Sequence, residues 1–146
     1  MSAIRQANVS DLDRIAEIEV FCYRLNFYPI FRNDEFYFDE LRVMNVAKEY
    51  AEALDQMWVY DDNVVKGFLQ IDGNEIKKLF VEPALQGRGI GAALIDDAIE
   101  RLKVRFLWAL EKNQRAIAFY ERHGFHTTEH KRLEEGTTEY LIRMER

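Results

Sequence analysis

Three glycines at alternate positions separate a hydrophobic stretch from an amphipathic one. The segment Gln86-Gly-Arg-Gly-Ile-Gly-Ala92 follows the apolar stretch 75–81 and Pro83. Backbone amides at the start of a helix lack partners within the helix and carry partial positive charge, so they attract phosphate oxygens. Glycine lets a phosphate approach the backbone without meeting a β-carbon, and Arg88 adds a full charge. The turn therefore suits a pyrophosphate, although a tight strand-to-helix connection would use glycine too.

Two common phosphate-binding motifs do not fit this turn. A Walker loop needs Gly-Lys-Ser or Gly-Lys-Thr, which is absent. The dinucleotide fingerprint needs Gly-x-Gly-x-x-Gly, whereas Gly87, Gly89 and Gly91 follow Gly-x-Gly-x-Gly. Glu111 stands at a distance that would suit a ribose contact, but the antiparallel strands predicted before the turn argue against a doubly wound sheet.

The glycine turn has a known counterpart. Gln86-x-x-Gly89-x-Gly91 resembles the acetyl-coenzyme A signature of the GNAT acyltransferase superfamily. Asn113-Gln-Arg-Ala-Ile-Ala-Phe-Tyr-Glu-Arg-His-Gly-Phe125 resembles that family's second signature, in which an Asn precedes an Ala-rich helix that bears a Tyr and ends at Gly-Phe. The resemblance covers the element order along nearly the whole chain and is weakest from Phe21 to Leu54, the part that usually varies with the acceptor.

The resemblance implies how acetyl-coenzyme A is held. Backbone groups of residues 79–81 would pair with the pantetheine arm as an extra strand, and the amides from Gly87 to Ala92 would hold the pyrophosphate. Asn113 would contact the pantetheine arm, and no metal is implied. The complete expected set is Leu79, Phe80, Val81, Gln86, Gly87, Arg88, Gly89, Ile90, Gly91, Ala92, Asn113, Ala116 and Tyr120.

The resemblance also implies the catalytic groups. Tyr120 stands where members often place the hydroxyl that protonates the departing thiolate, the alternative being a core aromatic. Some members carry a carboxylate five residues before the Asn, where this chain has Trp108, and that version of the mechanism is therefore in doubt. Others use a Glu near the start of the glycine-turn strand, which Glu75 resembles, although it also fits an exposed strand-end carboxylate. A water relay is a further option.

The predicted reaction is direct attack by a primary amine, of a small molecule or of a protein or peptide, on acetyl-coenzyme A. A non-catalytic acyl-coenzyme A sensor would keep the glycine turn but dispense with Glu75 and Tyr120. A nucleotide-binding interaction module is the third interpretation.

Length and charge limit the partners. A chain of 146 residues with 48% hydrophobic content predicts a single domain, residues 1–146, that needs no disulfide. The net charge of -6 opposes binding to nucleic acid or an anionic membrane and favours a cationic or amine-bearing partner. No signal peptide or membrane span is recognisable, and Cys22 is the one cysteine, so we expect a cytoplasmic monomer or homodimer.

Hydrophobic spacing predicts the N-terminal elements. A strand at 3–7 precedes a helix that starts at a capping box of Ser10 and Asp13 and carries Leu12, Ile15, Ala16, Ile18 and Cys22 at helical spacing. Cys22 is interpreted as core packing rather than a nucleophile. The segment 21–38 holds eight of the nineteen aromatic residues and reads as a loop that shapes the acceptor pocket or fills the core. A helix follows, with a buried stripe of Phe38, Leu41, Met44, Ala51 and Leu54.

The remaining elements predict a mixed sheet. Strands at 56–60, 64–71 and 75–81 form a meander, and helix 90–102 connects the third to strand 105–110, which should be its parallel neighbour. A helix from Gln114 to His123 ends at Gly124 before a hairpin that turns near Glu135 and Gly136. The fold class is layered α/β, with a mostly antiparallel sheet of six or seven strands and about four helices. His123, His126 and His130 share no helix face, which disfavours a metal site.

Overall fold

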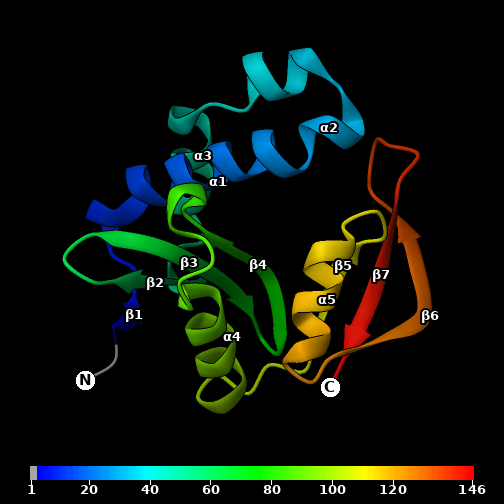
Figure 1. Cartoon of the computed structure of the whole chain (residues 1–146). Helices are drawn as coiled ribbons and strands as arrows, with labels where there is room; N and C mark the ends of the chain where they lie inside the picture. Colours follow the sequence, from blue (N-terminus) through cyan, green and yellow to red (C-terminus); the bar gives the residue numbers. More distant parts are fainter. Residues whose placement is uncertain (1–2) are drawn as a thin grey trace.

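The computed structural model describes residues 3–146 and has one seven-stranded sheet as its middle layer. The strands are β1 (Ile4–Gln6), β2 (Met57–Asp61), β3 (Val65–Asp72), β4 (Glu75–Val81), β5 (Phe106–Leu110), β6 (His126–Leu133) and β7 (Tyr140–Glu145). Their order across the sheet is β1-β2-β3-β4-β5-β7-β6, and only β4 and β5 are parallel (Figure 1). The predicted mixed sheet is confirmed, because a strand-helix-strand unit crosses over to a parallel neighbour.

Helices cover both faces of the sheet. The helices are α1 (Leu12–Asn26), α2 (Tyr28–Phe31), α3 (Val43–Ala51), α4 (Ile90–Glu100) and α5 (Gln114–Arg122). Helices α1 and α3 pack on one face of β3 and β4, and α4 packs on the other (Figure 1). Side chains alternate along β3, so Phe68 enters the first core and Leu69 the second.

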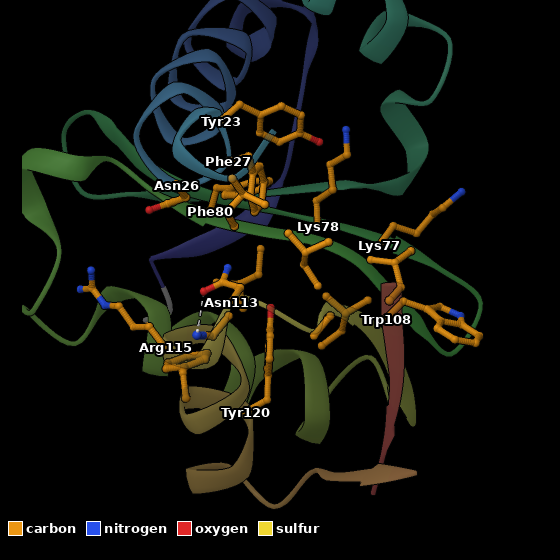
Figure 2. Close-up of a pocket in the computed structure, with 18 of the residues that line it drawn as sticks. Tyr23, Asn26, Phe27, Lys77, Lys78, Phe80, Trp108, Asn113, Arg115 and Tyr120 are labelled. Carbon is orange, nitrogen blue, oxygen red and sulfur yellow. Dashed lines mark hydrogen bonds between the residues drawn. The ribbon is translucent and has the colours of Figure 1, made fainter. Parts of the chain in front are cut away.

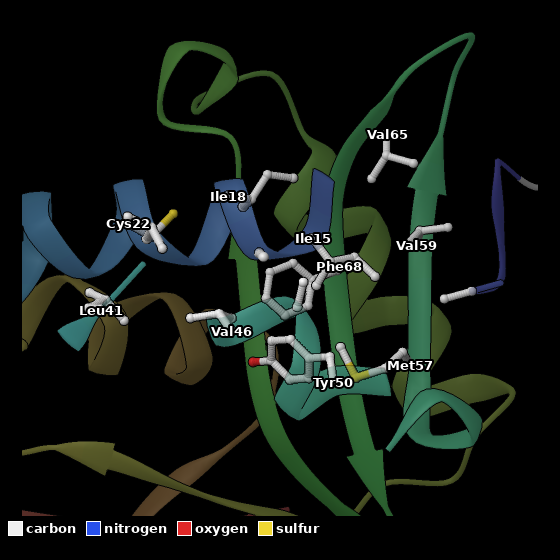
Figure 3. Close-up of a cluster of buried hydrophobic side chains, with 14 of the residues drawn as sticks. Ile15, Ile18, Cys22, Leu41, Val46, Tyr50, Met57, Val59, Val65 and Phe68 are labelled. Carbon is white, nitrogen blue, oxygen red and sulfur yellow. The ribbon is translucent and has the colours of Figure 1, made fainter. Parts of the chain in front are cut away.

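The first core lies between α1, α3 and the sheet. Figure 3 shows Phe68 of β3 between Ile15 of α1 and Tyr50 of α3. Ile15 and Phe68 are inaccessible to solvent. Burying an aliphatic or aromatic side chain of this size stabilises the fold by about 1.5–3 kcal/mol.

The second core depends on a close approach between α4 and the sheet. A β-carbon on Gly67 would lie 3.0 Å from Leu94 Cδ1 and 3.0 Å from the carbonyl oxygen of Phe80. The backbone oxygen cannot move aside cheaply, so glycine at this position lets α4 sit against β3. Sequence analysis had not singled out Gly67.

The start of α1 differs from the prediction. A capping box starts the 3-10 turn Val9–Asp11 that leads into α1: the Asn8 side chain accepts from the Ser10 amide, and the Asp11 carboxylate accepts from the Asn8 amide at 2.8 Å. The Ser10 and Asp13 assignment was therefore wrong. Asp11 has a further reason to hold this position, because Arg5 donates to both of its carboxylate oxygens, at 2.8 and 3.0 Å.

Two predictions for residues 21–54 were also wrong. The segment 21–38 is mostly helical rather than a loop, since α1 runs to Asn26, α2 follows, and a π-helical turn spans Phe36–Glu40. The buried face of α3 consists of Val46, Ala47 and Tyr50. Met44 and Phe38, expected in the buried stripe, are 69% and 49% exposed. The aromatic side chains of residues 21–38 pack against one another, and this packing decides which face of α3 is buried.

Candidate active site

The site begins where β4 and β5 part. The two strands pair only at Glu75 with Phe106 and Ile76 with Leu107. A bulge sits at the same place, since Ile71 pairs with Ile76 but Gln70 pairs with Lys78. Beyond it, β4 continues to Val81 beside a cavity of about 1280 Å³. The backbone edge of residues 79–81 thus faces open space in which another extended chain could pair with it.

The glycine turn forms one end of this cavity. Gly87 and Gly89 have φ of 83° and 84°, and Gly89 is the N-cap of α4. An added β-carbon at either would meet nothing within 4 Å, so it is the left-handed backbone that requires glycine there. Gly91 differs, because its β-carbon would lie 3.5 Å from Phe119 Cζ of α5. The turn presents the amides at the start of α4 to the cavity, as an anion site requires.

The structure gathers nearly all of the expected cofactor residues around the cavity. Those that line it are Leu79, Phe80, Val81, Gln86, Gly87, Gly89, Ile90, Gly91, Ala92, Asn113, Ala116 and Tyr120. Arg88 is the exception: it is exposed and is not part of the lining. Its side chain lies at the surface beside the turn.

Asn113 and Tyr120 are both placed by α5. Asn113 caps this helix, its Oδ1 accepting from the Ala116 amide at 3.2 Å, which fixes the side chain at the edge of the cavity. The Tyr120 ring packs against Phe119 and Phe125. Its hydroxyl makes no hydrogen bond within residues 3–146 and points into the cavity (Figure 2). Burial raises the pKa of Tyr120 to about 12, so the phenol keeps its proton at neutral pH.

Glu75 and Trp108 line the closed end of the cavity, next to the last pair of β4 and β5. Glu75 is partly exposed at the start of β4. The guanidinium of Arg132 lies over the Trp108 ring, with its Cζ 4.3 Å from the ring centroid. Trp108 therefore contributes a stacked aromatic face where some members of the family place a carboxylate.

The opposite wall contains a buried charge cluster that sequence reasoning missed. Glu19 of α1 is 2% exposed and accepts from the Tyr50 hydroxyl and from Lys78 Nζ, the latter at 2.7 Å. The Lys78 ammonium also lies over the rings of Tyr23 and Tyr50, at 5.5 and 5.0 Å. Lys78 and Glu19 are 59 positions apart, so no local pattern could have connected them. The cluster fixes a paired lysine beside the bulge of β4 (Figure 2).

Part of the aromatic segment completes this wall. Phe27, Phe31, Phe36 and Tyr37 line the cavity. Tyr28 is not part of the lining; its hydroxyl donates to Asp34 at 2.5 Å and its ring packs against Tyr37 and Phe38.

The cysteine and the histidines have structural contacts. Cys22 is buried and its Sγ donates to the Val81 carbonyl at 3.2 Å; burial raises the pKa of the thiol to about 12, which disfavours a nucleophilic thiolate. His123 Nδ1 lies 3.1 Å from Asp96 Oδ1. Residues 3–146 contain no group of three His, Cys, Asp or Glu side chains placed to hold a metal. In the same part of the chain, every helix is too short or too polar to span a bilayer.

Solved structures of N-acetyltransferases share this fold. The N-acetyltransferase from Staphylococcus aureus Mu50 superposes with a TM-score of 0.76 at 16% identity, covering 97% of this chain and 98% of that one. Apo YjaB from Escherichia coli gives 0.73 at 20% identity, covering 97% and 95%. The PaiA N-acetyltransferase from Thermoplasma acidophilum, solved with coenzyme A, gives 0.70 at 17%, covering 98% of each. The fold is thus that of the N-acetyltransferases.

Sequence comparison gives the family. The model of the acetyltransferase (GNAT) domain matches residues 53–127. An uncharacterized N-acetyltransferase from Archaeoglobus fulgidus is 36% identical over 131 residues, covering 80% of this chain and 88% of the relative. The chain belongs to the GNAT family of acetyltransferases.

Two further relatives match a shorter segment. The peptidyl-lysine N-acetyltransferase YiaC from Escherichia coli is 40% identical over 73 residues, covering 49% of this chain and 50% of the relative. The uncharacterized N-acetyltransferase MJ1207 from Methanocaldococcus jannaschii is 42% identical over 74 residues, covering 47% and 33%. The matched segment thus spans half or less of these two relatives.

Proposed function

We propose that this chain transfers an acetyl group from acetyl-coenzyme A to a primary amine by direct attack. The observation that carries the proposal is the continuous cavity along the open edge of β4, with the amides of the glycine turn at one end and the Tyr120 hydroxyl within it. Family membership supports this assignment, as do relatives named peptidyl-lysine N-acetyltransferases.

The chain supplies binding groups that match the chemistry of coenzyme A. The amides at the start of α4 suit the pyrophosphate, and the edge of residues 79–81, with which β5 does not pair, suits an arm containing amide groups. Asn113, whose side chain caps α5 at the edge of the cavity, would contact the same arm. A thioester positioned near the bulge of β4 would find backbone amides to polarise its carbonyl.

The reaction then needs one proton donor and one proton acceptor. The neutral amine attacks the carbonyl carbon, the carbon–sulfur bond breaks, and Tyr120 gives its proton to the departing thiolate. The proton lost by the amine passes to Glu75, directly or through water. Glu75 is the carboxylate among the expected catalytic residues that lines the cavity, while Trp108 has no basic group.

An amine-panel assay that reports free thiol tests the proposal. Wild-type protein is incubated with acetyl-coenzyme A and a set of small amines and lysine peptides, and mass spectrometry identifies the acetylated product. Acceptor-dependent thiol release supports transfer. If calorimetry shows coenzyme A binding while no acceptor in the panel is acetylated, a sensor role gains support. If neither binding nor transfer is seen, the cavity assignment is wrong.

A further inference from the structure

The turn between β6 and β7 faces the aromatic wall across the cavity. Glu134, Glu135 and Thr137 of this turn line the same cavity as Phe31 and Tyr37. Figure 1 shows the turn rising from the ends of β6 and β7 toward α2. Two segments about 100 positions apart in the sequence thus meet at the acceptor side of the site.

The backbone holds Glu134 in place. Its amide donates to the Glu139 carbonyl at 2.8 Å, and its carbonyl accepts from the Thr137 amide at 3.0 Å and the Thr137 hydroxyl at 2.8 Å. The side chain is partly buried, and within residues 3–146 its carboxylate forms no hydrogen bond or ion pair. By contrast, the neighbouring Glu139 is paired with Lys112 at 2.5 Å.

Two phenols line the cavity together with this carboxylate. Tyr37 is only 4% exposed, and neither its hydroxyl nor that of Tyr23 makes a hydrogen bond in the described chain. Burial raises the pKa of Tyr37 to about 12, and the charge of Glu134 contributes to this rise. Burial is the main cause that raises the pKa of Tyr23 well above its ordinary value, and the negative charges of Glu19 and Glu134 add to this rise. Both phenols therefore keep their protons at neutral pH and line the cavity as neutral hydroxyl groups.

This combination suits an ammonium or guanidinium group. A carboxylate and neutral phenol oxygens accept hydrogen bonds from such a cation, and aromatic faces attract it. Lys78 lines the same cavity but is already paired with Glu19. Lys77 of β4 and Arg132 of β6 also line the cavity; Arg132 lies two positions before Glu134 and stacks on Trp108, and within residues 3–146 neither forms an ion pair with Glu134. A partly buried carboxylate without a partner is costly, and a cationic ligand would offset that cost.

The cation at Glu134 is distinct from the reacting amine. The reacting amine must be neutral when it attacks the thioester, whereas a carboxylate with two phenol oxygens favours a group that keeps its positive charge. The partner of Glu134 is consequently a second charged group of the acceptor.

We propose that Glu134, with the hydroxyls of Tyr23 and Tyr37, binds a second positively charged group of the acceptor, so that favoured acceptors carry at least two cationic groups. The inference rests on the proposed function and adds the substrate class to it. A diamine and a lysine next to a basic residue in a peptide share this chemistry.

The test compares Glu134→Gln with wild-type protein and with Glu129→Gln, which removes an exposed carboxylate of β6 outside the cavity lining. The probes are butylamine, 1,4-diaminobutane, spermidine and the blocked peptides Gly-Lys-Gly and Arg-Lys-Arg. Losing a hydrogen bond to a charged group should lower kcat/KM for dicationic probes by roughly tenfold or more, mainly through KM. Glu129→Gln should match wild type. Comparing kcat/KM for the small polyamines with kcat/KM for the basic peptide shows which of the two kinds of acceptor is preferred.

Salt dependence and direct binding complete the test. Wild-type kcat/KM for dications should fall more steeply with ionic strength than that of Glu134→Gln, because the variant lacks the charge that salt screens. Equal loss for butylamine and the dications, or no loss for any probe, would overturn the inference while leaving acetyl transfer intact. If wild type acetylates none of the probes, the proposed function is in question, and calorimetry on the coenzyme A-loaded protein decides the inference separately. Tighter binding of spermidine than of butylamine, lost in Glu134→Gln, supports it, whereas equal binding refutes it.

Discussion

At the scale of single residues, Tyr120 is a neutral phenol whose hydroxyl points into the cavity. Its ring is held by Phe119 and Phe125, while its hydroxyl is left for the cavity. A phenol with a raised pKa loses its proton less readily than one in water, but it needs no tuning to be protonated at neutral pH. Trp108 and the buried pair of Glu19 and Lys78 provide shape and fixed charge around it.

Replacing Tyr120 by Phe keeps the ring and removes only the hydroxyl. General acid catalysis is typically worth about 10²- to 10⁴-fold, so kcat should fall by at least roughly 100-fold while the coenzyme A dissociation constant changes little. Stopped-flow turnover and calorimetry measure the two quantities. Near-parental turnover, under conditions where the chemical step limits the rate, would assign Tyr120 a structural role and the proton to water.

The pH profile follows from the direction of the Tyr120 shift. Because its pKa is raised to about 12, the acid form is fully present at neutral pH and is lost only as the pH rises toward 12. The amine must be neutral, and an unperturbed alkylamine titrates near about 10.4, so kcat/KM should rise from pH 7 to 9 without an alkaline decline. A fall within that range, in a protein shown to stay folded, would contradict Tyr120 as the donor.

At the scale of elements, the glycine turn and α4 act as one unit. Gly89 provides the left-handed residue that ends the turn and starts the helix. Gly91 belongs to the same motif, but its β-carbon would lie at ordinary contact distance from Phe119 of α5, so backbone conformation requires glycine at Gly89 and neither conformation nor space requires it at Gly91.

Gly89→Ala and Gly91→Ala form a matched pair. A β-carbon at φ of 84° costs about 1–2 kcal/mol, so Gly89→Ala should lower stability and weaken coenzyme A binding as the turn shifts. In Gly91→Ala the new carbon is at ordinary contact distance, 3.5 Å from Phe119, and we expect a stability change of less than about 0.5 kcal/mol. Urea unfolding and calorimetry compare them. Equal effects at both positions would show that space, not conformation, limits the turn.

The capping box of the 3-10 turn that precedes α1 depends on a carboxylate. Hydrogen bonds from Arg5, together with the bond from the Asn8 amide, hold the pKa of Asp11 below its usual value. Because folding lowers the pKa of Asp11, its carboxylate stabilises the folded state at pH values above the unfolded pKa of about 3.8. This stabilisation is lost as the pH falls through the lower folded pKa.

Asp11→Asn should therefore cost about 1–2 kcal/mol of stability at pH 7. The difference from wild type should shrink as the pH falls below 4, because protonation removes the same charge in the parent. Urea unfolding at several pH values measures it. A difference that is constant down to pH 3 would mean that the charge of Asp11 does not contribute.

At the scale of the whole molecule, the sheet is nearly divided in two. Strands β1 to β4 with α1, α3 and α4 form one part, and β5 to β7 with α5 form the other, with only two residue pairs between β4 and β5. The division is what creates the cavity. Because the proposed cofactor residues lie on both sides of it, in β4, α4 and α5, a bound coenzyme A would connect the two parts.

Coenzyme A should accordingly stabilise the whole molecule. At 100 times its dissociation constant, a ligand that binds only the native state adds about 2.7 kcal/mol, which for this chain length should raise Tm by roughly 6–12 °C. Hydrogen exchange should slow at residues 79–81, at the start of α4 and in α5. Protection confined to α4 would contradict binding across the division.

The sequence by itself determined the order of the elements, the parallel pair of β4 and β5, the glycine turn and the helix that bears Asn113 and Tyr120. These features have local signatures, in hydrophobic period, in glycine position and in the cap at Gly124, so they are readable within a few residues. Only the tertiary structure decided which face of α3 is buried and that Arg88 lies outside the cavity. The same holds for the Glu19 and Lys78 pair and for the presence of Glu134 and Tyr37 in the lining of one cavity, because these groups meet only after distant segments pack together.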